Sequence, residues 1–157
     1  MDNSDDTQTP KNVKEIEETA RQLLYRFLQP DAPGDLAEYL RPEPEDFREV
    51  FVESAVERAR EGYNAVWMQS PRPKGNPGQT VVRVWAVPAS LLTDENELSM
   101  RFPNGYRAIA HLFNPHRIWL AWKFLAPGER AGMAYDGLVW RGDRFAWFPK
   151  PYRILGD

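Results

Sequence analysis

Cysteine is absent from the 157-residue chain, and histidine occurs only twice. The absence of cysteine excludes a disulfide scaffold, a thiolate zinc site, an iron–sulfur cluster and a cysteine nucleophile. Long hydrophobic runs are also missing, since none approaches the ~20 residues that span a bilayer. The first six residues carry three acidic side chains and no basic one, where a secretory signal peptide would be basic. We therefore expect a soluble, cytoplasmic protein that has no membrane partner.

Common catalytic motifs are missing as well. The chain contains no G-x-S-x-G nucleophile elbow, no G-x-x-x-x-G-K-[ST] phosphate loop, no G-x-G-x-x-G and no H-E-x-x-H. His111 and His116 lie five residues apart across Asn114-Pro115, which would suit a metal only if a distant carboxylate completed the ligand set. We expect no metal and no cofactor, and the chain does not present the residues of a typical enzyme.

Hydrophobic and aromatic residues are plentiful, at 42% and 13% of the chain. A chain of this length and composition buries enough surface for one globular domain and leaves little room for a second. Residues 1–8 are polar, acidic and without periodicity, which predicts a disordered tail. The expected organisation is a tail at 1–8 and a single α+β domain over 9–157.

Charge is distributed unevenly along the chain. Residues 1–62 carry sixteen acidic and eight basic side chains, whereas residues 63–157 carry seven acidic and twelve basic ones. The two parts can neutralise each other through surface ion pairs, or they can form a polarised surface that steers a charged partner. A sequence pI of about 5.5 argues against a dedicated nucleic-acid binder.

The first half of the chain has helical periodicity. Thr9 as N-cap and Pro10 as first helical residue predict a helix that runs to about residue 28. A second long helix is expected over residues 44–68, followed by an exposed loop at 70–78 that holds three prolines and two glycines. The apolar side chains of the first helix recur at spacings of three and four: Val13, Ile16, Ala20, Leu23, Leu24, Phe27 and Leu28.

The second half alternates with the period of β-strands. Strands are expected over residues 80–87, 117–125, 131–140 and 144–148. Residues 106–113 fit either two turns of helix or a strand, and strand or irregular structure is favoured. In the strand at 117–125, Trp119 and Lys123 share a face, which predicts that part of this face lies outside the core. The predicted fold is two long N-terminal helices on a curved antiparallel sheet of three to five strands. This order of elements also occurs in the cone-shaped nuclear-transport-factor-like fold, which encloses a pocket.

The nearest approach to a catalytic set is His111 with Tyr135 and Asp136. Asp136-Gly137 is a candidate β-bulge, because glycine tolerates the positive φ that a bulge often requires. A carboxyl group at a bulge among aromatic side chains could be desolvated, with a pKa raised into the range of a general base. In the alternative interpretation, Asp136 bonds nearby backbone N–H groups and has a purely structural role.

Near its C-terminus the chain interleaves aromatic and cationic side chains. The cations are Arg141, Arg144, Lys150 and Arg153, and the aromatics are Trp140, Phe145, Trp147, Phe148 and Tyr152. Such a pattern can bind a protein partner or stack the bases of a nucleic acid. It can equally consist of core aromatics on one strand face and solvated cations on the other. We take the four cations as the candidate partner-binding residues.

The run Tyr135-Asp-Gly-Leu-Val-Trp140, followed by Trp147-Phe-Pro-Lys-Pro-Tyr-Arg153, resembles the ends of small uncharacterised bacterial proteins of a single domain. The resemblance implies a bacterial protein and supplies no catalytic residues. The leading hypothesis is a non-enzymatic domain that binds another protein, as an immunity-type inhibitor or accessory factor. The competing hypothesis is a small-ligand carrier or small enzyme, with a pocket between the helices and the sheet.

Overall fold

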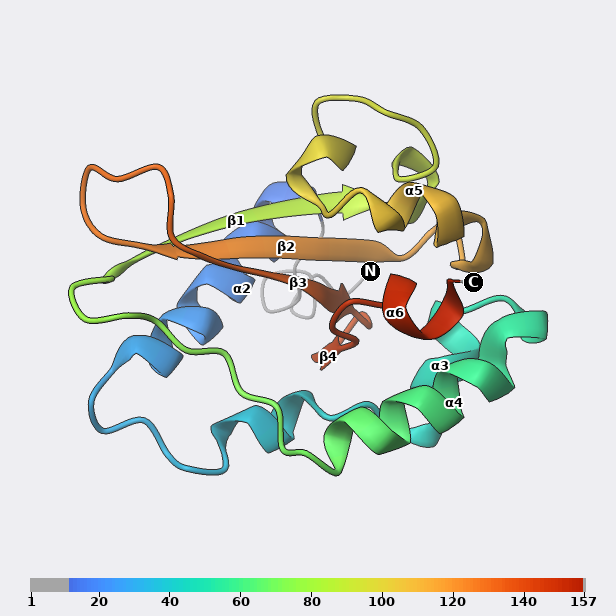
Figure 1. Cartoon of the computed structure of the whole chain (residues 1–157), viewed down its shortest axis with the longest axis horizontal. Coiled ribbons are helices and arrows are strands. Elements are labelled where there is room, and N and C mark those ends of the chain that lie inside the picture. Colours follow the sequence, from blue (N-terminus) through green and yellow to red (C-terminus); the bar gives the residue numbers. More distant parts are fainter. Residues whose placement is uncertain (1–11, 157) are drawn as a thin grey trace, which may run out of the picture.

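The computed structural model describes residues 12–156, which form helices and one sheet (Figure 1). The predicted tail at residues 1–8 and the helix start at Thr9-Pro10 lie outside the described residues. The helices are α2 (Val13–Tyr25), η1 (Arg26–Leu28), η2 (Leu36–Leu40), α3 (Pro44–Val50), α4 (Glu53–Trp67), η3 (Ala89–Leu91), η4 (Ser99–Arg101), α5 (Gly105–Ile109), η5 (Ala110–Leu112) and α6 (Tyr152–Leu155). The strands are β1 (Val81–Pro88), β2 (Ile118–Leu125), β3 (Met133–Trp140) and β4 (Phe145–Trp147).

Helix α2 follows the predicted apolar stripe. Asn12 is its N-cap, and the Asn12 side chain accepts a hydrogen bond from the Glu15 backbone N–H at 2.9 Å. Its buried side chains are Ile16, Ala20 and Leu24, spaced by four residues, so they line one face of the helix. This face packs against the sheet at β1, and Figure 1 shows α2 crossing behind the strands.

The second long helix is broken, which corrects the prediction of one helix over residues 44–68. The chain leaves helical geometry at Phe51, where φ is −113° and ψ is 153°. Phe51 forms an isolated antiparallel bridge with Phe113, and the Val52 N–H donates to the Leu112 carbonyl at 2.8 Å. No glycine or proline marks this break, because it is made by a tertiary contact.

Residues 106–112 are helical, in α5 and η5, so the helical alternative is correct and the favoured strand or irregular structure was wrong. The buried residues of this stretch are Tyr106, Ile109, Ala110 and Phe113. They lie at i, i+3, i+4 and i+7, which is the spacing of a helix face. The segment covers one end of the sheet with these side chains.

The sheet is an antiparallel meander in the order β1-β2-β3-β4. The register of β2 and β3 shifts between Leu120 and Ala121, which confirms the predicted bulge at Gly137. Gly137 has a φ of +92°, and an added Cβ would lie 2.1 Å from the Phe148 carbonyl oxygen. Only glycine fits this position, because both the backbone angle and the close approach exclude a side chain.

The two faces of the sheet are covered to different extents. On one face Trp122 lies against Trp147, with ring centroids 5.9 Å apart, and Trp147 in turn packs edge-on against Trp67 of α4. On the other face Trp119 is fully buried and stacks on Phe113 at 4.0 Å. The part of this face that holds Trp119 therefore belongs to the core.

Lys123 marks the uncovered end of that second face. Its Cα pairs with that of Arg83 on β1, whose side chain is exposed, and with that of Ala134 on β3, which is exposed as well. Cross-strand partners point to the same side of a sheet. The second face is thus core around Trp119 and open around Lys123.

Within residues 12–156 no helix is long and apolar enough to cross a membrane.

Candidate functional site

Strand β1 forms one border of the sheet, and alternate residues of it point their backbone groups away from β2 (Figure 1). The Ala89 N–H, just after β1, donates to the Arg117 carbonyl at 2.8 Å. The backbone N–H and C=O groups of the odd-numbered residues of β1 therefore point toward β2. The Ala86 N–H points outward instead and donates to the Glu17 carboxylate of α2 at 2.8 Å. By the same alternation, the N–H and C=O groups of Val82 and Val84 point to the outer edge.

A groove lies along this outer edge, between β1 and α2. Its volume is about 340 Å³. One wall is β1 from Val82 to Trp85, and the other wall is the polar face of α2. The α2 side chains that line it are Lys14, Glu17, Glu18 and Arg21. Backbone hydrogen-bonding groups of an edge strand therefore open into a space with polar walls.

The open side of β1 also presents an aromatic ring between two cations. The guanidinium carbon of Arg83 lies 5.3 Å from the centroid of the Trp85 ring, and that of Arg101 in η4 lies 5.0 Å from it. Lys123 is the cross-strand partner of Arg83, so two like charges face each other on adjacent strands. Within the described part of the chain, none of these three cations forms an ion pair.

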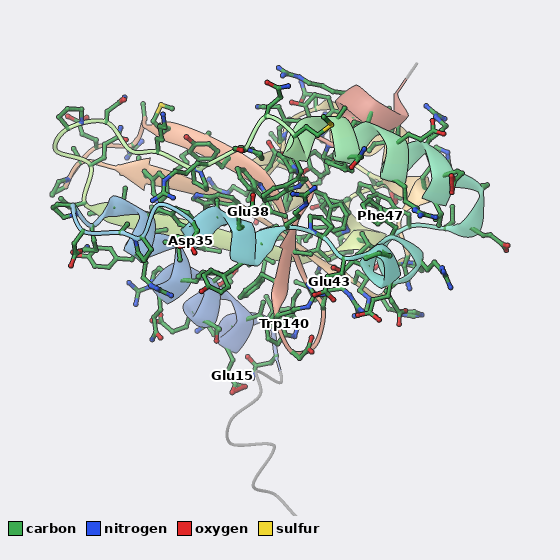
Figure 2. The ribbon with its side chains drawn as sticks, turned by 90° about the horizontal axis from the view of Figure 1, so that it is seen from below. Glu15, Asp35, Glu38, Glu43, Phe47 and Trp140 are labelled. Carbon is green, nitrogen blue, oxygen red and sulfur yellow. The ribbon has the colours of Figure 1, made fainter. Side chains whose placement is uncertain are left out.

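The hairpin arginines have a different environment. Arg144 donates to both carboxylate oxygens of Asp46, at 2.6 and 2.8 Å, and the Arg141 Nε donates to the same carboxylate at 2.5 Å. Asp46 is fully buried, whereas the side chains of Arg141 and Arg144 are 12% and 29% exposed. The alternative in which Arg144 is a solvated cation therefore does not apply, because its side chain is bonded to a buried carboxylate. Figure 2 shows the start of α3, at Glu43, beside the end of β3 at Trp140.

The Asp46 carboxylate is stabilised in its charged form. Burial by itself would raise the pKa of Asp46, but the hydrogen bond from Arg144 opposes this effect. The Glu43 backbone N–H, at 2.7 Å, and Arg141 add further hydrogen bonds, so the pKa lies below its ordinary value. The carboxylate thus neutralises the hairpin and joins it to α3.

Asp136 is buried, and its contacts are structural. Its Oδ1 accepts hydrogen bonds from the Tyr106 hydroxyl at 2.6 Å and from the Lys150 backbone N–H at 2.9 Å. Burial and the nearby charge of Asp136 raise the pKa of Tyr106 well above its ordinary value. Tyr106 therefore stays protonated and donates to the carboxylate, which fastens α5 and the turn at Lys150 to the bulge.

The other members of the predicted catalytic set lie apart from these contacts. Tyr135 exchanges hydrogen bonds with the backbone of Lys74: its hydroxyl accepts from the N–H at 2.8 Å and donates to the carbonyl at 3.0 Å. His111 lies in η5 with an exposed side chain. Within residues 12–156 no hydrogen bond joins His111 to Tyr135 or Asp136. The described residues also contain no cluster of three histidine or acidic side chains that could hold a metal.

A second pocket, of about 420 Å³, lies between α4 and the segment before α3. Figure 2 shows this segment, from Glu38 to Phe47, running beside α4. The two arginines at its rim are paired, Arg41 with Glu38 at 3.8 Å and Arg60 with Glu57 at 3.2 Å. The remaining lining residues are Pro42, Pro44, Phe47, Glu61, Tyr63, Asn64 and Trp67. The predicted catalytic residues do not line it.

Lys150 and Arg153 are the two predicted partner-binding cations that have no ion pair among the described residues. Lys150 is half-buried in a turn with a φ of +49°, and Arg153 is exposed on α6. The cations around Trp85 were missed. The sequence did hold a signal for these cations. Arg83 and Trp85 are two residues apart on one predicted strand, and Lys123 lies on another.

Comparisons of the chain with protein-family models, with curated protein sequences and with solved structures found no match.

Proposed function

We propose that the chain is a non-enzymatic protein-binding domain of the bacterial cytoplasm, acting as an inhibitor or accessory factor, and that its partner presents acidic side chains. The observation that carries the proposal is the open surface at Trp85. Arg83 and Arg101 lie over its ring, Lys123 is the cross-strand partner of Arg83, and none of the three forms an ion pair within residues 12–156. Unpaired cations around a partly buried tryptophan favour an anionic partner, because both the charges and the ring gain contacts when it binds.

The contrast with other surface charges supports this assignment. The arginines of α2 and α4 that form ion pairs do so with acidic side chains of their own helix, such as Arg21 with Glu18 and Arg60 with Glu57. These pairs neutralise each other locally and leave little field for a partner. The cations around Trp85 keep their charge for an external ligand and steer its approach at low ionic strength.

The small-ligand alternative has less support. In a nuclear-transport-factor-like cone a pocket would lie between the helices and the sheet. Here aromatic side chains occupy that region, with Phe148 packed edge-on against Phe47, Phe51 and Tyr63 at 5.2–5.5 Å. The pocket beside α4 offers a small ligand some space, but its rim arginines are already paired.

An affinity capture from the native host tests the proposal. Three forms of the chain serve as bait: the wild type, the double variant Arg83→Glu/Arg101→Glu, and a matched control, Arg26→Glu/Arg48→Glu, whose arginines are exposed elsewhere. We expect a protein that the wild type and the control capture and the first variant loses. Calorimetry with that purified protein should show weaker binding as salt is raised, because exposed charges are screened beyond ~10 Å at 0.1 M.

Two results would overturn the proposal. One is a wild-type bait that captures no protein beyond those held by the Arg83→Glu/Arg101→Glu variant. The other is displacement of the captured protein by single-stranded DNA at equal concentration, since that would assign the cationic surface to a nucleic acid.

A further inference from the structure

Among the described residues, no strand pairs with the outer edge of β1. The N–H and C=O groups of Val82 and Val84 point away from β2 into the groove, and within residues 12–156 no hydrogen bond reaches them. We propose that an extended segment of the partner adds to this edge as an antiparallel fifth strand, with acidic side chains at every second position. The inference rests on the proposed function and specifies how the partner binds.

The open stretch has defined limits. At Ala86 the outward N–H is already bonded to the Glu17 carboxylate, and Pro88 has no N–H to offer. The segment therefore pairs with residues 82–84, where the two outward-facing valines supply two donors and two acceptors. Main-chain hydrogen bonds of this kind provide affinity in strand addition, and the alternating side chains provide specificity.

The opposite border of the sheet is not available in the same way. Strand β4 has only three residues, and η2 packs against it. An edge strand that is short and covered by another element does not pair readily with a new strand. The eight-residue β1 is accordingly the border at which a partner strand can add.

The alternation of β1 dictates the chemistry of the added segment. A residue placed opposite Arg83 points to the same face as Arg83 and Trp85, and lies in a close pair that makes no main-chain hydrogen bond. An acidic side chain there meets Arg83 and, beside it on the Trp85 ring, Arg101. Residues opposite Val82 and Val84 point toward α2 and into a groove of about 340 Å³, which suits β-branched side chains.

The test uses a capped eight-residue peptide, Glu-Val-Glu-Thr-Glu-Val-Glu-Thr, with a fluorophore and full-length protein. In antiparallel pairing the valine and threonine N–H groups donate to β1, whereas the glutamate N–H groups point to solvent. We expect N-methylation of the valines and threonines to weaken binding by about tenfold or more. N-methylation of the four glutamates is the matched control, and we expect it to change the dissociation constant by less than about threefold.

A substitution in the protein supplies the complementary test. Val84→Pro removes an outward N–H and adds a ring at the edge, but it breaks no hydrogen bond to β2. We expect this variant to lose peptide binding by about tenfold or more while its far-ultraviolet circular dichroism matches the wild type. The N-methylated peptides keep the inference testable if the variant does not fold.

Three results would overturn strand addition. The first is an absence of binding, and the second is an equal effect of the two N-methylated peptides. The third is a concentration-dependent dimer of the wild type that the peptide cannot dissociate, because a second copy would then occupy the edge. If the native partner is still captured through Arg83 and Arg101, any of these results removes the added strand and leaves the proposed function intact.

Discussion

The two borders of the sheet carry similar side chains and use them differently. At the β3–β4 border, Arg141 and Arg144 converge on a buried carboxylate and Trp147 is 3% exposed. At the β1 border, Arg83 and Arg101 flank a partly buried Trp85 and have no acidic partner within the described residues. A cation next to an aromatic residue therefore does not by itself define a binding surface. The position of one carboxylate, Asp46, decides which border is structural.

The largest expected effect separates the two tryptophans. Trp147→Ala should destabilise the protein by about 3–5 kcal/mol, because it empties a buried site between Trp67 and Trp122 and removes the indole donor to the Asp136 carbonyl, 2.8 Å away. Trp85→Ala should cost no more than about 1 kcal/mol, since its ring is only partly buried. Urea denaturation of both variants measures the difference, and equal midpoints would contradict the assigned interior of the sheet.

Asp46→Asn comes next. It removes the charge of the buried carboxylate to which both Arg141 and Arg144 donate, for which we expect a loss of about 3 kcal/mol. Glu43→Gln is the control, because its ion pair with Arg144 involves a carboxylate that is 60% exposed, and it should cost no more than about 0.5 kcal/mol. Chemical denaturation at neutral pH compares the two, and a larger loss for Glu43→Gln would reverse the ranking.

The same carboxylate predicts a pH dependence. The pKa of Asp46 is lowered in the folded protein relative to an unfolded value of about 3.9, so its contribution is fully present above that value. The contribution is lost as the pH falls through the folded pKa. The difference in unfolding free energy between wild type and Asp46→Asn should therefore shrink from pH 6 toward pH 3. Denaturation at several pH values measures it, and a constant difference would show that the ion pair is not its source.

Arg144→Ala should have a moderate effect. It removes two charge-assisted hydrogen bonds to Asp46, so we expect a loss of about 1.5–3 kcal/mol, well above the ~0.5 kcal/mol typical of a solvated side chain. Lys150→Ala, without an ion pair among the described residues, should stay within about 0.5 kcal/mol. Thermal unfolding of both variants gives the comparison. If the two melting temperatures agree, Arg144 is not a structural residue.

The smallest effect on stability is expected at the β1 border. Arg83→Ala/Arg101→Ala should change the free energy of unfolding by no more than about 0.5 kcal/mol, because both side chains are exposed. It should nevertheless weaken binding of the captured partner by about tenfold at low salt. Denaturation and calorimetry on the same preparation separate these effects. A variant that unfolds more easily and binds normally would move the function away from this border.

Some features follow from the local sequence. Apolar residues at spacings of three and four predict helix α2. A run of β-branched residues that ends at a proline predicts strand β1. The pair Asp136-Gly137 predicts the bulge, because glycine readily accepts the positive φ of the bulged position. These features are decided by a residue's own backbone preferences and by its near neighbours, so periodicity and turn chemistry are sufficient to predict them.

Other features depend on residues that are distant in the sequence. The break at Phe51 needs the bridge to Phe113, and the burial of Trp119 needs the helical segment after residue 105. At the site, the pattern of residues is enough to show that cations lie beside aromatics in the second half of the chain. That Asp46, nearly a hundred residues from Arg144, neutralises the hairpin follows from the fold. An ion pair requires proximity in space, and only chain folding brings such distant charges together.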